Sequence, residues 1–402
     1  MRTVEMTLTK ALLLGGLTFL LMLPETLPVP VLRALVVERF GVGDRAATWF
    51  MAANMLGALL AAPLVGWWIE RTGRRRGLAV ALLLLDALLM QGLAHPLDYA
   101  SFLLLRLGEG AAHLAALVTV MSLVADAAGE RRGRALGGQG AGLTLGVATG
   151  AAIGGVLGRS DPLCTLHTAS VVLAVAALAA AWLLPADRVP TTRPGFRELL
   201  AAVRQQPRLG PPLVVAFAER FTVGFFTTGF PLLLTSVHAL SRPQVGMLLA
   251  AFLYPFALLS YPFGRLAETR SRRRLVAIGS LGYGACVLLV GVVPSAWLWV
   301  LMPLCGIGSA VMFVPSLLWL LDEAPGLGRA AAIALFHAAG SLGFLLGPIA
   351  CGELLALGGT ADGARAGYVL AFVAAGLVQM AAGLLVLGGT RDGLTPPCRS
   401  TS

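Results

Sequence analysis

The feature that most constrains this chain is a series of long apolar stretches, separated by short polar segments. A helix needs about 20 apolar residues to cross the roughly 30 Å hydrocarbon core of a bilayer. Twelve stretches reach that length, which predicts twelve membrane-spanning helices. The predicted spans are Leu8–Leu32, Thr48–Ile69, Gly77–Ala94, Tyr99–Ala125, Arg134–Leu157, Cys164–Leu184, Leu209–Val237, Pro243–Gly264, Leu275–Val293, Trp297–Leu321, Ala330–Leu357 and Gly367–Gly388.

Composition excludes the soluble classes, because 57% of the residues are hydrophobic and only 12% are charged. Soluble globular proteins carry about 25% charged residues. The formal net charge is +10, yet the arginines lie in short runs between apolar stretches, which is typical of orienting loops. We therefore expect the lipid bilayer as surroundings and no nucleic acid as a partner.

The distribution of basic residues predicts the topology. Most of the 30 basic residues lie in alternate loops, on the side that also holds both termini. Cytoplasmic loops are enriched in Lys and Arg, so both termini are expected in the cytoplasm. We expect a multi-pass protein of the cell (inner) membrane that acts as a monomer.

A proline-rich connection divides the chain into six spans plus six. Within it, apolar residues recur at helical spacing from Phe196 to Val203, which predicts a short helix on the membrane surface. The expected units are a six-helix bundle over 1–184, a cytoplasmic linker with that amphipathic helix over 185–208, a second six-helix bundle over 209–390 and a tail over 391–402.

The two halves carry related sequences. Gly66 and Gly264 each precede a glutamate and a run of arginines, and Gly146-x-x-x-Gly150 in span five matches Gly343-x-x-x-Gly347 in span eleven. Two bundles related by an axis along the membrane normal form one of the transporter repeat architectures. The repeat therefore indicates a transporter.

Three motifs resemble those of a known family. Gly66 to Arg75 resembles the loop signature of the major facilitator superfamily, with Glu70 in place of an aspartate. Arg106 to Gly110 is similar to its Arg-x-x-Gln-Gly element, with Glu109 in place of glutamine. The glycines of span five resemble the signature of its drug:proton antiporter branch, with Ala151 in place of a proline. The resemblance implies an all-α membrane protein of twelve transmembrane helices in two six-helix bundles.

The resemblance also implies roles for the loop signatures and the span glycines. The loop signatures would gate the transporter, with a merely orienting basic loop as the alternative. The gating residues would be Gly66, Glu70, Arg71, Gly73, Arg74, Gly264, Glu268 and Arg272. Small residues also pack membrane helices, so hinge and packing roles are both open for the glycines. The hinge residues would be Gly146, Gly150, Gly154, Gly155, Gly347 and Pro348.

Ionisable residues inside the spans mark a candidate site. A charge at the bilayer centre costs about 2.5–3.5 kcal/mol even on the lower scale, so each should have a partner or a water path. Glu25 in span one and Arg106 in span four lie at similar depth, and Glu109 follows Arg106 by one turn. We expect these three to form a cluster that carries protons or binds a charged substrate group. A purely structural ion pair is the alternative.

Other residues are expected to line a substrate cavity. Phe217, Phe221 and Phe225 recur every four residues, and each step of four advances only about 40° around a helix, so they can line one wall. Packing is the alternative for these rings, and a satisfied helix contact is the alternative for His113. The cavity set is Thr18, His113, Phe217, Arg220, Phe221, Phe225 and Trp319.

The sequence contains no phosphate-binding Gly-x-x-x-x-Gly-Lys-Ser/Thr loop, and its His and Cys residues lack metal-ligand spacing. We therefore expect no enzyme activity, no cofactor and no metal. The predicted function is secondary active transport by alternating access, with proton-coupled efflux of small lipophilic or amphipathic molecules. The alternative is a solute-specific symporter or uniporter for a sugar, organic anion or similar metabolite.

Overall fold

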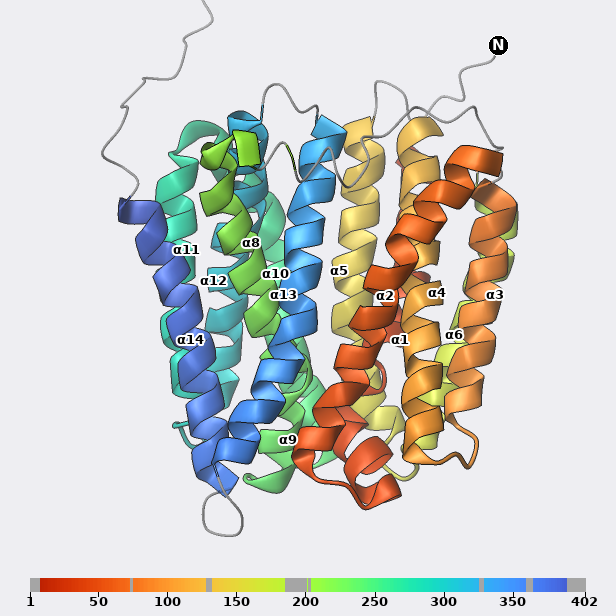
Figure 1. The fold of residues 1–402 in the computed structure, drawn as a ribbon, viewed down its shortest axis with the longest axis vertical. Coiled ribbons are helices and arrows are strands. Elements are labelled where there is room, and N and C mark those ends of the chain that lie inside the picture. Colours follow the sequence, from red (N-terminus) through yellow and green to blue (C-terminus); the bar gives the residue numbers. More distant parts are fainter. Residues whose placement is uncertain are drawn as a thin grey trace, which may run out of the picture.

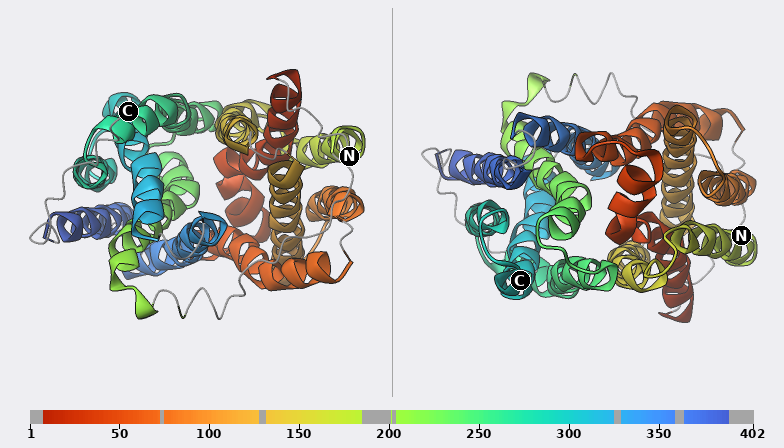
Figure 2. Two further views of the ribbon diagram at one scale, coloured as in Figure 1. Left: turned by 90° about the horizontal axis from the view of Figure 1, so that it is seen from above. Right: turned by 90° about the horizontal axis from the view of Figure 1, so that it is seen from below.

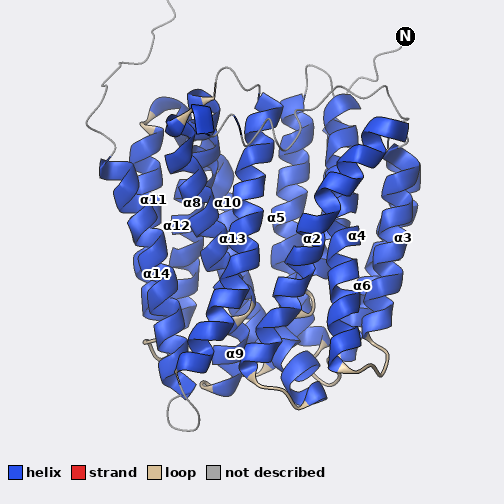
Figure 3. Cartoon of the chain, in the orientation of Figure 1, coloured by secondary structure: helices blue, strands red, loops and turns tan. Residues whose placement is uncertain are grey.

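The computed structural model describes residues 8–72, 75–127, 132–184, 201, 204–324, 329–358 and 364–388 (Figure 1). Within these ranges every regular element is a helix, and short loops and turns connect them (Figure 3). The thirteen α-helices are α1 (Leu8–Thr26), α2 (Asp44–Thr72), α3 (Arg75–Leu93), α4 (Tyr99–Ala127), α5 (Arg132–Leu157), α6 (Leu163–Leu183), α8 (Gly210–Thr227), α9 (Gly229–Ser236), α10 (Arg242–Thr269), α11 (Arg272–Val290), α12 (Ser295–Glu323), α13 (Arg329–Leu357) and α14 (Ala364–Gly388).

These helices form the two predicted six-helix bundles, which stand side by side (Figure 2). Eleven segments of the described residues are long and apolar enough to cross a membrane. The remaining predicted span, Thr48–Ile69, lies within the 29-residue helix α2. The linker's predicted surface helix falls almost wholly outside the described residues.

The first span of each half departs from a regular helix near one end. Span one ends as α1 at Thr26 and continues through a short 3₁₀ turn, Val29–Val31. Span seven is broken at Thr228 into α8 and α9. Proline explains both changes, because it lacks a backbone N–H and its ring clashes with the carbonyl four residues earlier. Pro28 and Pro30 lie at the first break and Pro231 follows the second.

We call the end of the bundle where α1 ends and α2 begins the distal end, which is at the bottom of Figure 1. Both proline breaks lie at this end, and so do the loops α3–α4 and α5–α6. The opposite, proximal end holds the starts of α1, α3 and α5.

Glycine lets helices pack backbone to backbone within each half. A Cβ on Gly146, Gly150 or Gly154 of α5 would overlap a carbonyl oxygen of α1 or the loop that follows it. In the second half, a Cβ on Gly343 or Gly347 of α13 would overlap carbonyl oxygens of α8. Small residues permit such close approach. The hinge glycines Gly146, Gly150, Gly154 and Gly347 thus lie inside the halves.

The halves themselves meet along two seams, α2 against α13 and α5 against α10. Gly155 belongs to the second seam, because a Cβ there would collide with the backbone of Arg242. In the first seam, a Cβ on Gly352 would collide with the Thr48 side chain. Both of these close approaches lie toward the distal end.

Candidate functional site

A buried charge cluster occupies the N-terminal half. Arg106 on α4 is fully buried, and its Nη1 lies 2.5 Å from Glu109 Oε2. Its Nη2 lies 3.8 Å from Glu25 Oε1 on α1. The guanidinium therefore shares its charge between two carboxylates from different helices, in the arrangement that the sequence analysis expected.

The same cluster contains a buried histidine and a third carboxylate. His113 Nδ1 lies 2.8 Å from Asp86 Oδ2 of α3, and His113 Nε2 lies 3.8 Å from Glu25 Oε2. Asp86 is fully buried. The sequence had given no account of Asp86, although a lone aspartate inside an apolar span was itself a signal of a buried partner.

Helix geometry and one glycine position these groups. Arg106, Glu109 and His113 follow the i, i+3, i+7 spacing that puts side chains on one helix face. A Cβ on Gly110 would overlap the backbone of Asn54, so this glycine lets α2 approach α4 closely. Asn54 Nδ2 then donates a 2.9 Å hydrogen bond to Glu109 Oε2.

Apolar groups surround the arginine. Its guanidinium carbon lies 4.3 Å from the centre of the Phe50 ring, a cation–π contact that adds to the ion pairs. Phe50 itself is fully buried. Such surroundings strengthen the attraction between the charges and raise the cost of leaving one unpaired.

The C-terminal half has a smaller charged group. Glu219 on α8 is buried, and it accepts a 3.2 Å hydrogen bond from Ser309 of α12. Arg220 Nη1 lies 3.2 Å from Glu219 Oε2, and 26% of the Arg220 side chain stays exposed. The Arg220 guanidinium carbon also lies 4.7 Å from the centre of the Phe313 ring. Glu219 thus faces inward, whereas the adjacent Arg220 faces a more open space.

The predicted cavity residues divide by burial. Phe217 and Phe221 are half-buried and stack with ring centres 5.8 Å apart. Phe225 is fully buried, in edge contact with the Phe372 ring of α14. The structure therefore places two of the three rings at the edge of α8 and one in the core.

Two further cavity residues lie in packed surroundings. The Thr18 hydroxyl is fully buried and donates to the carbonyl of Leu14 in its own helix. The Trp319 ring is buried, and its Nε1 donates a 3.0 Å hydrogen bond to Glu323 at the proximal end of α12. Local bonds satisfy both groups, so in this conformation neither is free to contact a substrate.

A half-open apolar cavity of about 440 Å³ lies at the outer surface where the halves meet, and Trp49, Leu56 and Leu104 of its lining are exposed. Its lining comes from α2 and α4 of the first half and from α13 of the second, and it is almost entirely hydrocarbon. Trp49, Leu103 and Leu345 are among the residues that line it. The cavity thus crosses the α2–α13 seam.

The gating residues of the first half fall where the structure gives no side-chain description. Gly66, Glu70 and Arg71 belong to the undescribed side chains of α2, and Gly73 and Arg74 lie outside the described residues.

The counterpart in the second half forms a polar network at the proximal end. Arg272 pairs with Asp322 of α12 and donates a 3.2 Å hydrogen bond to the Leu318 carbonyl. Glu268 is exposed, and a Cβ on Gly264 would lie 3.0 Å from the Val314 side chain. These contacts tie α11 and the end of α10 to α12 within one half.

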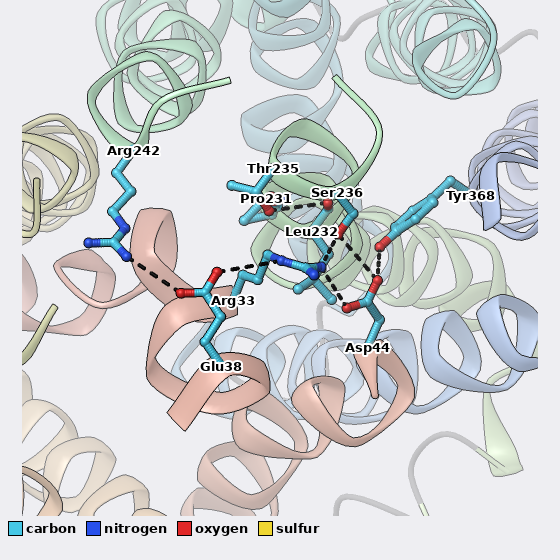
Figure 4. Close-up of polar contacts among 9 residues, drawn as sticks. All are labelled: Arg33, Glu38, Asp44, Pro231, Leu232, Thr235, Ser236, Arg242 and Tyr368. Atoms are coloured by element: carbon cyan, nitrogen blue, oxygen red, sulfur yellow. Dashed lines mark hydrogen bonds and ion pairs between the residues drawn. The ribbon is translucent and has the colours of Figure 1, made fainter. Parts of the chain in front are cut away.

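Polar contacts join the two halves at the distal end (Figure 4). Asp44, the first residue of α2, accepts a 2.5 Å hydrogen bond from the Tyr368 hydroxyl of α14 and lies 3.2 Å from Arg33 Nη1. Arg33 also donates to the Ser236 hydroxyl of α9. Arg242 of α10 lies 3.6 Å from Glu38. We call these six residues the distal network, and sequence reasoning had identified none of them as functional.

Comparisons with known proteins bear on this architecture. The sequence matches the profile of the Major Facilitator Superfamily twice, over residues 14–237 and 212–397. The comparison with curated proteins found no match.

Several solved structures share the fold. The nucleoside transporter NupG is similar with a TM-score of 0.75 at 14% identity, over 94% of this chain and 98% of that one. A bacterial homolog of the human lysosomal transporter Spinster, solved inward-facing and unoccupied, gives 0.74 at 16% identity, over 95% and 97%. A POT family transporter in complex with a thioalcohol-conjugated peptide gives 0.73 at 11% identity, over 94% and 95%. At these identities the likeness shows the fold alone.

Proposed function

The chain belongs to the major facilitator superfamily and is a secondary transporter, and from that premise we propose proton-coupled efflux of small amphipathic molecules. The observation that carries the coupling is the cluster of Glu25, Arg106 and Glu109 inside the first bundle. Carboxylates that share an arginine inside a bundle are suited to exchanging a proton for an ion pair.

The chemistry of such coupling follows from the contacts. When Glu25 takes up a proton it loses its charge, and the 3.8 Å attraction to Arg106 ends. Arg106 then keeps only Glu109 as a direct ion-pair partner. Because α1 and α4 each carry one side of the Glu25–Arg106 pair, protonation changes the force between two helices of the same bundle.

Alternating access requires that one end closes while the other opens. The distal network and the close approach at Gly155 support a state that is closed at the distal end. With both termini in the cytoplasm of a cell-membrane protein, the distal end would face outward. The loop signatures would then gate the cytoplasmic end, and Gly155 at the seam is the hinge glycine best placed to act between the halves.

The aromatic edge of α8 and the apolar cavity support the substrate class. Phe217 and Phe221 offer flat faces to aromatic or cationic compounds. The 440 Å³ cavity offers an apolar surface shared by both halves. A lipophilic cation would find negative charge at Glu25, which is partly exposed.

One observation favours the alternative of a solute-specific transporter. The Arg220 guanidinium keeps about a quarter of its side chain exposed, and an exposed arginine suits a carboxylate or phosphate group. An organic anion would bind there without using the aromatic edge. The two functions therefore predict opposite charge preferences.

The test is transport into proteoliposomes under an imposed pH gradient. Wild-type protein should accumulate a fluorescent lipophilic cation only when the gradient is present, and Glu25→Gln should lose accumulation while retaining substrate exchange. The matched control is Asp98→Asn, an exposed carboxylate at the start of α4 whose capping role asparagine preserves.

Accumulation that ignores the pH gradient would contradict proton coupling. If an organic anion is transported more efficiently than any lipophilic cation, the solute-specific alternative replaces efflux of amphipathic molecules. Arg220→Gln should then abolish anion transport.

A further inference from the structure

We propose that Glu25, Glu109 and His113 form a binding site for a divalent transition-metal ion of the Zn²⁺ or Co²⁺ class. Their ligand atoms all lie within 4.8 Å of one another. Glu109 and His113 lie one turn apart on α4, but Glu25 on α1 is distant in the sequence, so no single spacing motif shows all three ligands. This inference goes beyond proton coupling and does not depend on the direction of transport.

Each of the two glutamates contacts Arg106 through only one of its carboxylate oxygens. Arg106 contacts Oε1 of Glu25 and Oε2 of Glu109. The other oxygen of each carboxylate, Glu25 Oε2 and Glu109 Oε1, is buried and has no hydrogen-bond partner. Each glutamate therefore uses one oxygen on the arginine and keeps the other available as a ligand.

Asp86 orients His113 so that one ring nitrogen is left without a partner. Its Nδ1 is held by Asp86 at 2.8 Å, while its Nε2 is buried, has no hydrogen-bond partner and lies 3.8 Å from the free Glu25 oxygen. A metal-ligating histidine almost always gives its second ring nitrogen to a carboxylate or carbonyl, which fixes the tautomer. Asp86 would be that orienting carboxylate.

The cluster contains more carboxylates than cationic side chains. Three carboxylates, Glu25, Glu109 and Asp86, lie in the cluster with one arginine, Arg106, so its net charge is −2 when all three are ionised and His113 is neutral. Buried charge must be paired or bound to a metal. In that ionisation state one divalent cation would balance the cluster, and one ligand atom from each of Glu25, Glu109 and His113 lies within 4.8 Å of the others.

The donor set indicates which ions fit. Imidazole nitrogen suits zinc, copper, iron and nickel, whereas sites for magnesium and calcium use oxygen alone. Bonds to zinc are about 2.0–2.2 Å long. Two such bonds span the 3.8 Å between His113 Nε2 and Glu25 Oε2 at an open angle, and Glu109 offers the third ligand atom of the group.

Purified protein without a histidine tag, stripped with chelator, provides the direct test. Titration with Co²⁺ should show one ion bound per chain and a visible ligand-field spectrum without a sulfur-to-cobalt charge-transfer band. The missing sulfur band separates this site from the thiol pair of Cys286 and Cys305 in the second half. Mg²⁺ at the same concentration should give no calorimetric signal.

Variants assign the ligands. Glu109→Gln and His113→Gln should each weaken Co²⁺ binding more than 100-fold, and Asp86→Asn should weaken it about 10–100-fold, the range for an orienting partner. The matched control is His167→Gln on the exposed face of α6, which should leave binding unchanged. Each variant's elution as a single folded species and its Tm are measured alongside.

Wild-type protein provides a readout that needs no variant to fold. Co²⁺ or Zn²⁺ should raise its Tm in a concentration-dependent way, and Mg²⁺ should not. The proposal is overturned if no ion binds, if the spectrum reports thiolate ligands, or if folded His113→Gln binds like wild type. None of these results would affect proton-driven transport in proteoliposomes, so failure here is distinct from failure of the proposed function.

Discussion

The two bundles share one scaffold but hold charge in different ways. In both, glycines pack the fifth helix of the bundle directly against the first: Gly150 of α5 lies against α1, and Gly347 of α13 lies against α8. The first bundle encloses Arg106 completely, with Glu25 of α1 and Glu109 of its own helix beside it. The second leaves Arg220 partly exposed, with only its neighbour Glu219 as an ion-pair partner among the described residues.

The core of the second bundle is stabilised by aromatic rings instead. Phe226 stacks on Phe252 with ring centres 5.0 Å apart, and Phe252 stacks on Tyr283 at 6.2 Å. Phe372 meets the same group from α14. A repeated backbone can thus carry a buried charge cluster in one copy and a largely aromatic core in the other.

The largest predicted loss of stability is at Arg106, and Arg220 in the second bundle provides the contrast. Arg106→Gln leaves buried carboxylates without their cation and should lower the free energy of unfolding by about 3–5 kcal/mol. Arg220→Gln should cost no more than about 1 kcal/mol, because water reaches that side chain. Reversible unfolding in mixed micelles measures both, and equal losses would remove the contrast between the bundles.

The shared scaffold predicts matched losses. Gly150→Ala and Gly347→Ala should each destabilise the protein by about 1–3 kcal/mol, since each new methyl group overlaps a backbone carbonyl. Gly16→Ala in the first bundle and Gly282→Ala in the second have open space around the new Cβ and serve as controls.

Those controls should be neutral or stabilise by up to about 1 kcal/mol, because alanine favours helix. A large loss at Gly150 with none at Gly347 would mean that the bundles do not share this helix contact. The measurement is again unfolding of the purified variants.

The distal network should respond to loss of one charge. Asp44→Asn weakens hydrogen bonds from Arg33 and Tyr368, at a cost of about 1–2 kcal/mol, or a roughly 5–30-fold shift toward opening. The opening is measured by labelling Thr48→Cys as the single cysteine in an otherwise cysteine-free protein. Arg45→Gln, which breaks an exposed pair with Glu353, should change labelling much less. Unchanged labelling in Asp44→Asn would mean that the seam does not depend on this residue.

The smallest effect concerns substrate recognition. Phe221→Ala removes one half-buried ring and should weaken recognition of aromatic cations by about 0.5–2 kcal/mol, seen as a higher KM. Transport by Phe221→Ala should depend on the pH gradient as transport by the wild type does. If the gradient dependence changes instead, proton coupling is not confined to the first bundle.

The sequence predicted what depends on local pattern. The span lengths follow from hydropathy, and the internal repeat of the two halves follows from the glycines that recur in both. The twelve-helix fold could therefore be predicted from the sequence. The cluster of Glu25, Arg106 and Glu109 was accessible too, because depth along a helix can be counted at about 1.5 Å per residue.

Contacts that depend on rotation and tilt were not accessible. Asp86 meets His113 only because α3 packs on α4 at one rotation, and Asp44 meets Tyr368 across more than 300 residues of chain. The burial of Thr18 and Trp319 likewise follows from how each helix face is turned. Sequence periodicity fixes neighbours on one helix but not the rotation of one helix against another.

The glycine contacts between α1 and α5 have a mechanical consequence. Because the two backbones are in direct contact at the glycines, and Thr26 donates a 2.7 Å hydrogen bond to the Val147 carbonyl, we expect α1 and α5 to move together. One helix of that pair carries Glu25, and the other carries Gly155 against Arg242 of the opposite bundle. A displacement of Glu25 is therefore expected to shift Gly155 against Arg242 at the seam.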